Sequence, residues 1–163
     1  MLKERFNTLK NLLLEETRGF YGDRLVTLAV FGSAARETQS YTSDLDFIIV
    51  AEDLPDGRMK RVAEFEEVEK KLEPLIHSFG AEGIHTRLSP VFKSPEEVVG
   101  GSPLFIDMVE DLSMLHDRNG FFENRISVLR KRLAALGARR IWKGNAWYWD
   151  LKPDYKPGEV FEL

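Results

Sequence analysis

Cysteine is absent from the 163 residues of this chain, and its absence removes several chemistries at once. Without thiols the chain has no disulfides, no thiolate metal sites and no cysteine nucleophile. Long apolar runs are missing too, since none approaches the ~20 residues that a membrane-spanning helix needs. The N-terminal leucines alternate with acids, unlike the apolar core of a signal peptide. We therefore expect a cytoplasmic protein without membrane contact.

Positive charge is not in excess either. The 23 lysines and arginines stand against 27 acids, which gives a formal net charge of -4. This balance argues against a protein that coats nucleic acid. Hydrophobic residues make up 43% and charged residues 31%, as in ordinary globular proteins. A chain of this length is expected to form one domain with its own core.

Helices are indicated where apolar residues recur every three or four positions. This spacing predicts a helix near the N-terminus, a second over 59–72 that Pro74 ends or kinks, and a last one over 122–136. Ser-Pro pairs at 94–95 and 102–103 predict two more helix starts, because proline suits the first helical turn.

Strands are indicated by short apolar runs between turn residues, at 25–31, 44–50, 83–92 and 112–115. The first two are joined by about a dozen residues, too few for a helical crossover, so we expect them to pair antiparallel. The pattern predicts an α+β fold. Its small mixed or antiparallel sheet would have helices on one face and leave the other face free for a site.

The chain changes character at its C-terminal end. Residues 1–137 are expected to form the domain, which ends in the C-terminal helix, whereas 138–163 form an aromatic, proline-bearing tail. We expect this tail to be an arm packed on the domain or on a partner. Four of its aromatic residues could stack a base or an acceptor, with Arg139, Arg140 and Lys143 beside them; they are Trp142, Trp147, Tyr148 and Trp149. The alternative is that they only pack on the domain or across a dimer.

One stretch carries the candidate chemistry, FGSAARETQSYTSDLDF at 31–47. Asp44 and Asp46 open the apolar strand and share a face, because alternate strand residues point the same way. Both could therefore reach one hard cation through oxygen ligands, and leaving them unpaired among apolar neighbours would be costly. The alternative is a purely structural pair that caps a turn or meets a lysine.

A Gly32-Ser33 pair precedes the two acids by ten residues. Glycine lets a phosphate approach the backbone closely, and a helix start offers N–H donors to it. Two carboxylates around one magnesium ion, facing a phosphate-binding turn, form a layout that suits phosphoryl-type transfer.

The pattern hydrophobic-Gly-Ser, ten residues, Asp-hydrophobic-Asp-hydrophobic resembles the signature of the DNA polymerase β-like nucleotidyltransferase superfamily. Residues 32–47 look most like the minimal nucleotidyltransferases, whose loop often reads GSRARG…SDID. Arg36 and Ser43 stand where that pattern has Arg and Ser, while Ala34 and Glu37 replace an Arg and a Gly. A weaker resemblance extends from about residue 20 to 137 and leaves out the tail.

This resemblance implies roles for five residues. Gly32 and Ser33 would hold the β- and γ-phosphates of a nucleoside triphosphate. Asp44 and Asp46 would bind one or two Mg²⁺ ions, with Mn²⁺ as the alternative, and align an acceptor hydroxyl with the α-phosphorus. Arg36 would touch a phosphate, unless it is simply a solvated arginine on a short helix.

The superfamily usually adds a third carboxylate on the neighbouring strand, and this chain departs from that pattern. The candidate strand contains no acid between Glu82 and Glu96, and its predicted register puts His85, Arg87 and Ser89 on one face. Three explanations stay open. Glu82 substitutes for the third acid, or the site works with two acids, or catalysis has been lost and nucleotide binding kept.

The resemblance implies a magnesium-dependent enzyme that moves a nucleoside monophosphate from a triphosphate to a hydroxyl on a protein, a small molecule or RNA. The alternative is a catalytically weakened nucleotide-binding module or an antitoxin-like module that binds a partner. Minimal nucleotidyltransferases are commonly paired with small all-helical proteins, so such a partner is expected on resemblance. A purely structural α+β domain is the third reading.

Overall fold

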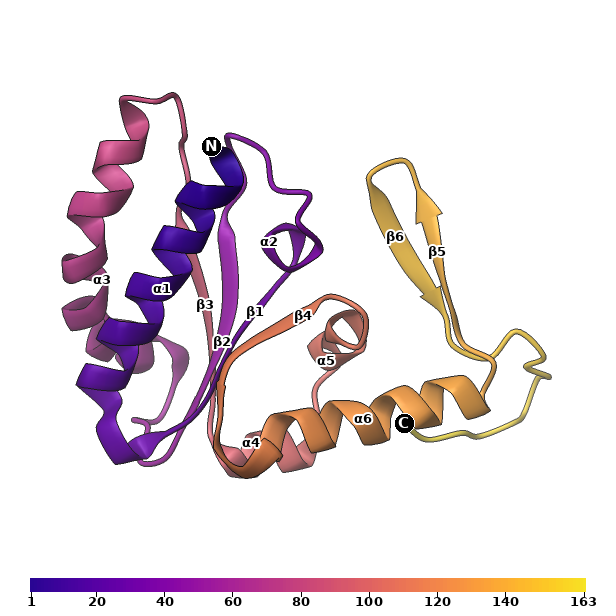
Figure 1. The fold of residues 1–163 in the computed structure, drawn as a ribbon. Coiled ribbons are helices and arrows are strands. Elements are labelled where there is room, and N and C mark those ends of the chain that lie inside the picture. Colours follow the sequence, from indigo (N-terminus) through magenta and orange to yellow (C-terminus); the bar gives the residue numbers. More distant parts are fainter.

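A computed structural model describes residues 1–163, which form a four-stranded sheet with helices and a separate hairpin (Figure 1). The sheet order is β3-β2-β1-β4, with β1 antiparallel to both neighbours and β2 parallel to β3. The predicted α+β class with a mixed sheet is therefore confirmed, as is the antiparallel pairing of the first two strands. The strands are β1 (Leu25–Phe31), β2 (Leu45–Ala51), β3 (Leu88–Lys93) and β4 (Leu112–Asp117).

The three long helices follow the predicted apolar spacing, and two short ones begin beside the predicted Ser-Pro pairs. The helices are α1 (Leu2–Tyr21), α2 (Ser33–Arg36), α3 (Arg58–Gly80), α4 (Pro95–Gly100), α5 (Leu104–Met108) and α6 (Phe121–Ala135), with 3₁₀ turns at Gly22–Arg24 and Arg118–Gly120. The Ser94 side chain caps α4 in a capping box, which satisfies N–H groups of its first turn. None of these helices is long and apolar enough to cross a membrane.

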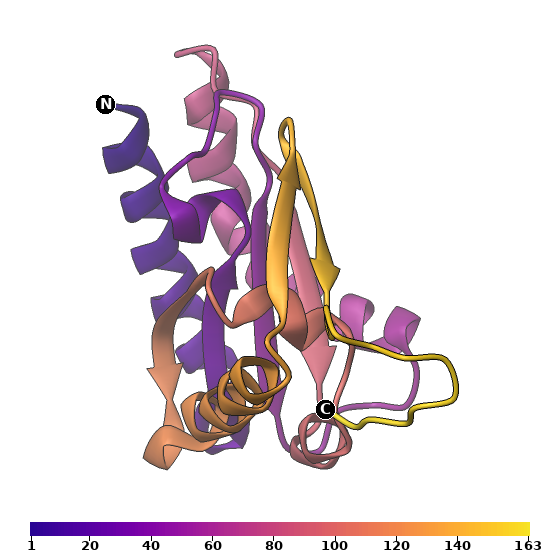
Figure 2. The ribbon, with the colours of Figure 1, turned by 90° about the vertical axis from the view of Figure 1, so that its right-hand side faces the viewer.

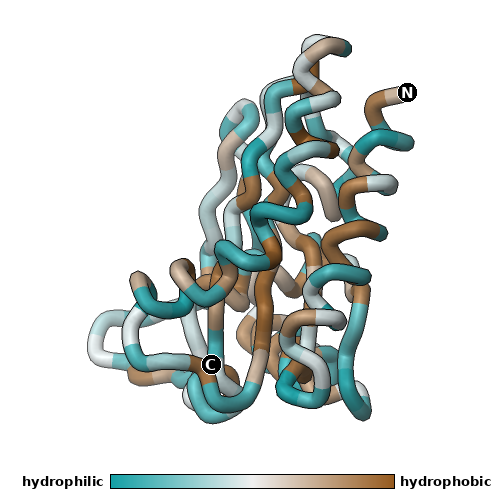
Figure 3. Tube along the Cα trace, turned by 90° about the vertical axis from the view of Figure 1, so that its left-hand side faces the viewer, coloured by the Kyte–Doolittle hydropathy of each residue, from teal (hydrophilic) through white to brown (hydrophobic).

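Helices α1 and α3 cover one face of the sheet. Figure 3, seen from their side, shows α1 alternating between hydrophilic and hydrophobic residues, as expected of a helix with one buried stripe. The stripe packs with one side of β2 in a core that includes Phe6, Leu9, Phe47, Ile49 and Phe65.

The other face of the sheet is less open than the sequence predicts. Helices α4, α5 and α6 cover much of it, and their buried side chains form a second core with Ile48 and Val50 of β2. Helices therefore pack on both faces rather than on one. The short apolar segments after β3 fold back over the sheet because β2, apolar on both sides, would otherwise expose its second face. Asp46 lies on this second face, beyond the point where the core ends.

Two element boundaries differ from the prediction. Pro74 does not end its helix, which continues to Gly80 because the buried stripe extends to Phe79 and its packing outweighs one lost hydrogen bond. The third strand begins at Leu88 rather than at 83. It contains Pro90, which is tolerated because β3 is an edge strand.

The tail forms a two-stranded antiparallel hairpin, β5 (Arg139–Lys143) and β6 (Ala146–Asp150), followed by an extended segment. Figure 2 shows this hairpin beside the second face of the sheet, the face that carries Asp46. The sequence pattern did not predict this pair of strands.

Asp117, the last residue of β4, joins the sheet to α6. Its carboxylate accepts hydrogen bonds from the backbone N–H groups of Phe122 (3.0 Å) and Glu123 (2.9 Å) and from the hydroxyl of buried Thr27 (2.8 Å). One side chain thus satisfies two donors of the first turn of α6 and a polar group inside the fold.

Replacing Asp117 by Ala should lower the free energy of unfolding by about 2 kcal/mol, because the helix loses its cap and Thr27 loses its partner. Urea denaturation measures the change. Glu66→Ala, at an exposed site of α3, is the control and should have little effect. Equal stability of both variants would show that the cap contributes nothing.

Candidate active site

The turn between β1 and α2 is shaped by Gly32. Its φ of 69° and ψ of -152° lie in a region that residues with a Cβ rarely adopt. A Cβ built there would lie 2.6 Å from Oδ2 of Asp46, closer than atoms can pack. Glycine is therefore required for two reasons, the backbone conformation and the space that the Asp46 carboxylate occupies. The predicted turn and the second predicted carboxylate are in direct contact.

The two carboxylates sit at the start of β2. Asp44 is exposed just before the strand, and Asp46 is half-buried as its second residue. Burial raises the pKa of Asp46, a hydrogen bond with the Ser89 side chain opposes the increase, and the charge of Asp44 adds to it. The charge of Arg36 lowers the pKa of Asp46. An ionised pair here is under electrostatic strain that a bound cation would relieve.

Strand β3 places no carboxylate beside Asp46. Ser89 pairs with Asp46 across the two strands, and the Arg87 carbonyl accepts a hydrogen bond from the N–H of Leu45 at 2.8 Å. The position beside Asp46 thus carries a hydroxyl and no carboxylate. Glu82 accepts a hydrogen bond from Nε of Arg5 at 3.0 Å, which engages it with α1. No three His, Cys, Asp or Glu side chains gather closely enough to hold a metal ion, so Glu82 does not complete such a cluster.

Two carboxylates still fit one kind of ion. Magnesium commonly keeps several waters and uses one or two protein carboxylates together with substrate phosphates. Asp44 and Asp46, with the turn beside them, are a donor set of that type. The set is too small for a cage made of protein ligands alone.

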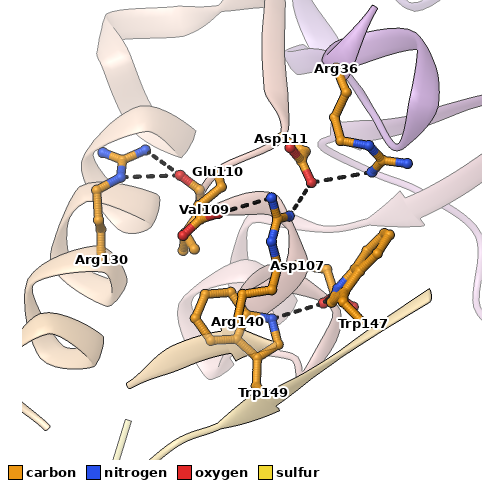
Figure 4. A network of polar contacts seen from close by, with 9 residues as sticks. All are labelled: Arg36, Asp107, Val109, Glu110, Asp111, Arg130, Arg140, Trp147 and Trp149. Atoms are coloured by element: carbon orange, nitrogen blue, oxygen red, sulfur yellow. Dashed lines mark hydrogen bonds and ion pairs between the residues drawn. The ribbon is translucent and has the colours of Figure 1, made fainter. Parts of the chain in front are cut away.

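Arg36 is not solvated, and this alternative from the sequence is wrong. Its side chain is only 19% exposed, and Nη1 donates to Oδ2 of Asp111 at 3.2 Å. The guanidinium also lies 4.8 Å from the ring centre of Trp147 (Figure 4). Arg36 is therefore held between the domain and the hairpin, one helical turn after Ser33.

The hairpin is attached to the domain by three acids that the sequence analysis did not single out, one of them Glu110, which pairs with Arg140 at 2.9 Å. Buried Asp111 forms ion pairs with both Arg36 and Arg140. Asp107 of α5 accepts hydrogen bonds from the indole N–H groups of Trp147 (2.9 Å) and Trp149 (3.1 Å), as Figure 4 shows. The only signal in the sequence was the presence of these acids in the apolar stretch 104–115.

A cleft of about 890 Å³ has Asp44 in its wall. Its walls come from the end of α3 and from the segment that leads into β3, and they include His77, His85 and Arg87. His85 lies in this segment, before the strand, and its backbone N–H donates to the Tyr41 carbonyl at 2.7 Å. Of the two carboxylates, Asp44 is the one that lines this cleft.

Comparison with known proteins adds two kinds of similarity. A curated relative from Methanocaldococcus jannaschii, named "Putative protein adenylyltransferase MJ1305", is 26% identical over 150 residues, which cover 88% of this chain and 97% of that protein. A solved toxin–antitoxin structure with AMP-PNP is 19% identical with a TM-score of 0.48, covering 78% of this chain and 92% of that one. A solved MntA-HepT toxin–antitoxin structure is 18% identical with a TM-score of 0.42, covering 80% and 92%.

A family model, described as a nucleotidyltransferase domain, matches residues 11–94. This is just over half of the chain and contains the Gly32 turn, both aspartates and all of β3. The superfamily resemblance drawn from the sequence is thereby confirmed. The chain belongs to the nucleotidyltransferase domain family and is a transferase.

Proposed function

We propose that this protein transfers a nucleoside monophosphate from a nucleoside triphosphate to a hydroxyl-bearing acceptor, with magnesium bound by Asp44 and Asp46. The observation that carries the proposal is the contact between the Gly32 turn and the Asp46 carboxylate. At this contact, the backbone that would bind phosphate lies beside the carboxylate oxygens that would bind the metal ion. The name of the archaeal relative suggests ATP as the donor and a protein as the acceptor.

Each proposed residue has a distinct task. The backbone at Gly32 and Ser33 binds the β- and γ-phosphates, and Arg36 adds positive charge one helical turn further on. Ser89 orients Asp46 through its hydroxyl. A bound magnesium ion would neutralise phosphate charge and make the α-phosphorus easier to attack. The acceptor hydroxyl enters from the Asp44 side, where the cleft lies.

The second candidate is a nucleotide-binding or antitoxin-like module with little transfer activity. It is favoured by Ser89, which stands beside Asp46 where the superfamily usually has its third carboxylate. Both candidates predict nucleotide binding at the same residues, so only transfer can separate them. Incubation with magnesium, labelled ATP and candidate acceptor proteins tests the first candidate directly.

We expect magnesium and ATP together to raise the melting temperature, because a ligand that binds only the folded state stabilises it. Asp46→Asn should remove most of this increase, whereas Asp56→Asn, at an exposed site outside the candidate site, should preserve it. Thermal denaturation with and without magnesium measures both. An unchanged metal response in Asp46→Asn would remove Asp46 from the site.

The stability of Asp46→Asn without metal, measured against pH, tests the raised pKa of Asp46 separately. Because the pKa of Asp46 is raised in the folded state, its protonated form favours folding, and this contribution is lost as the pH rises through the raised pKa. Asp46→Asn should therefore be more stable than wild type at neutral pH. The difference should disappear below the ordinary aspartate pKa of about 4, where both side chains are neutral.

Gly32→Ala tests the turn. The added Cβ would meet Asp46 Oδ2 and force an unfavourable φ, so the phosphate turn and the carboxylate must both shift. We expect at least about a tenfold loss of ATP affinity, with a cost of roughly 1–3 kcal/mol in stability from the strained backbone. Gly57→Ala is the control, since its φ is also positive but nothing lies near its Cβ. Equal ATP affinity in both variants would place the phosphates elsewhere.

Ser89→Asp tests whether the missing acid limits the rate. It adds a carboxylate on the strand that pairs with Asp46, and we expect transfer to become at least about tenfold faster, less than the roughly hundredfold or more of a well-placed general base. Manganese should also speed the wild-type reaction, because it accepts a wider range of ligands than magnesium. Ser89→Asn has a similar size without charge and should not accelerate transfer. Acceleration by Asn as well would show that charge is not the cause.

A further inference from the structure

One face of the hairpin β5–β6 gathers its large aromatic residues. Trp142 pairs with Trp147, and Arg140 pairs with Trp149, across the two strands. Directly paired residues share a face, as do alternate residues along a strand, so all four lie on the same side. Their contacts with Asp107 and Asp111 show that this side is turned toward the domain (Figure 4).

This aromatic face adjoins the candidate nucleotide site. Arg36 connects them, because its guanidinium lies 4.8 Å from the Trp147 ring and 5.8 Å from the Trp142 ring, while its charge acts on Asp46. Arg36 follows Ser33 by one turn of α2, which rises about 5 Å. Figures 1 and 2 agree that the hairpin stands on the side of the sheet that carries α2.

The face is anchored through two of its tryptophans and not through the third. Trp147 and Trp149 donate their indole N–H groups to Asp107. Trp142, directly across from Trp147, has no hydrogen bond through its indole and is 47% exposed although it faces the domain. Its ring centre lies 5.0 Å from that of Trp147, with the rings tilted by 54°. The Arg36 and Arg140 guanidiniums lie over both rings, and Trp142 supplies the exposed part of this aromatic surface.

We propose that Trp142 and Trp147 bind the nucleobase of the nucleotide, an assignment that rests on the proposed function. Aromatic rings bind bases by stacking, and an adjacent guanidinium strengthens such platforms. Arg36 lies between this aromatic face and the Gly32 turn, so the base of a nucleotide bound at the turn by its phosphates would lie near this face. A nucleobase fits better than a protein partner because the rings face inward, toward the domain.

Asp111 has a positioning role in this arrangement. It is buried and pairs with Arg36 of the nucleotide site and with Arg140 of the hairpin. Asp111 thus links the hairpin to α2, while Asp107 and Glu110 also hold the hairpin on the domain.

The test compares two probes, ATP and inorganic tripolyphosphate, each titrated with magnesium into the full chain by calorimetry. Tripolyphosphate has the phosphates but no base. Trp142→Ala should weaken ATP binding by about tenfold or more, the usual contribution of one stacked base, and leave tripolyphosphate binding unchanged. Trp142→Phe should restore most of the ATP affinity. Tyr148→Ala, on the opposite face of the hairpin and 53% exposed, is the matched control and should change neither.

Two results would overturn the assignment and leave the proposed function standing. One is unchanged ATP affinity in Trp142→Ala, and the other is an equal loss for both probes, which would indicate a general disturbance of the site. Loss of binding to an acceptor protein with ATP affinity intact would likewise reject the nucleobase in favour of a partner surface. If the wild type binds neither probe, the proposed function fails and this inference fails with it.

Discussion

The missing side chain of Gly32 is the constraint on which the candidate site depends. Because no Cβ fills that space, the Asp46 carboxylate can lie against the backbone of the turn. Everything else is arranged around this contact. The antiparallel pairing of β1 and β2 brings the end of one strand beside the start of the other, and the two cores on either face hold β2 rigidly in register. A charged pair is thus positioned by a closely packed apolar scaffold that continues along the same strand.

The scaffold also explains why two aspartates are tolerated where a buried strand begins. Ile48 and Val50 continue their face of β2 into the second core, so the strand is stabilised further along by burial on both sides. Only its first residues reach the margin of that core. There burial raises the pKa of Asp46, which means that its ionised form is energetically costly. The Ser89 hydroxyl and the charge of Arg36 offset part of that cost. The core residues of this strand, Ile48 and Val50, thus lie only a few positions from the two aspartates of the candidate site.

Local patterns predicted most of the fold, because burial imposes periodicity. The stripe of α1, the doubly apolar β2 and the spacing between the Gly-Ser pair and the aspartates could all be read from the chain. The covering of the second face could not, since α4 and α5 are short and reveal little periodicity. The contacts of Arg36 were equally hidden, because Asp111 is 75 residues away and nothing local links them. The start of β3 was misplaced since apolar residues before it are buried without forming a strand.

The carboxylate of Asp111 has a consequence beyond holding the hairpin. Two guanidiniums from distant parts of the chain share its charge, so each weakens the hold of the other. If Arg36 turned toward another anion, more of the Asp111 charge would act on Arg140, which also pairs with Glu110 at 2.9 Å. Thermodynamic reciprocity would make the relation run both ways, so that the seating of the hairpin would change how readily Arg36 is released. The hairpin and α2 are linked in this way through one buried carboxylate.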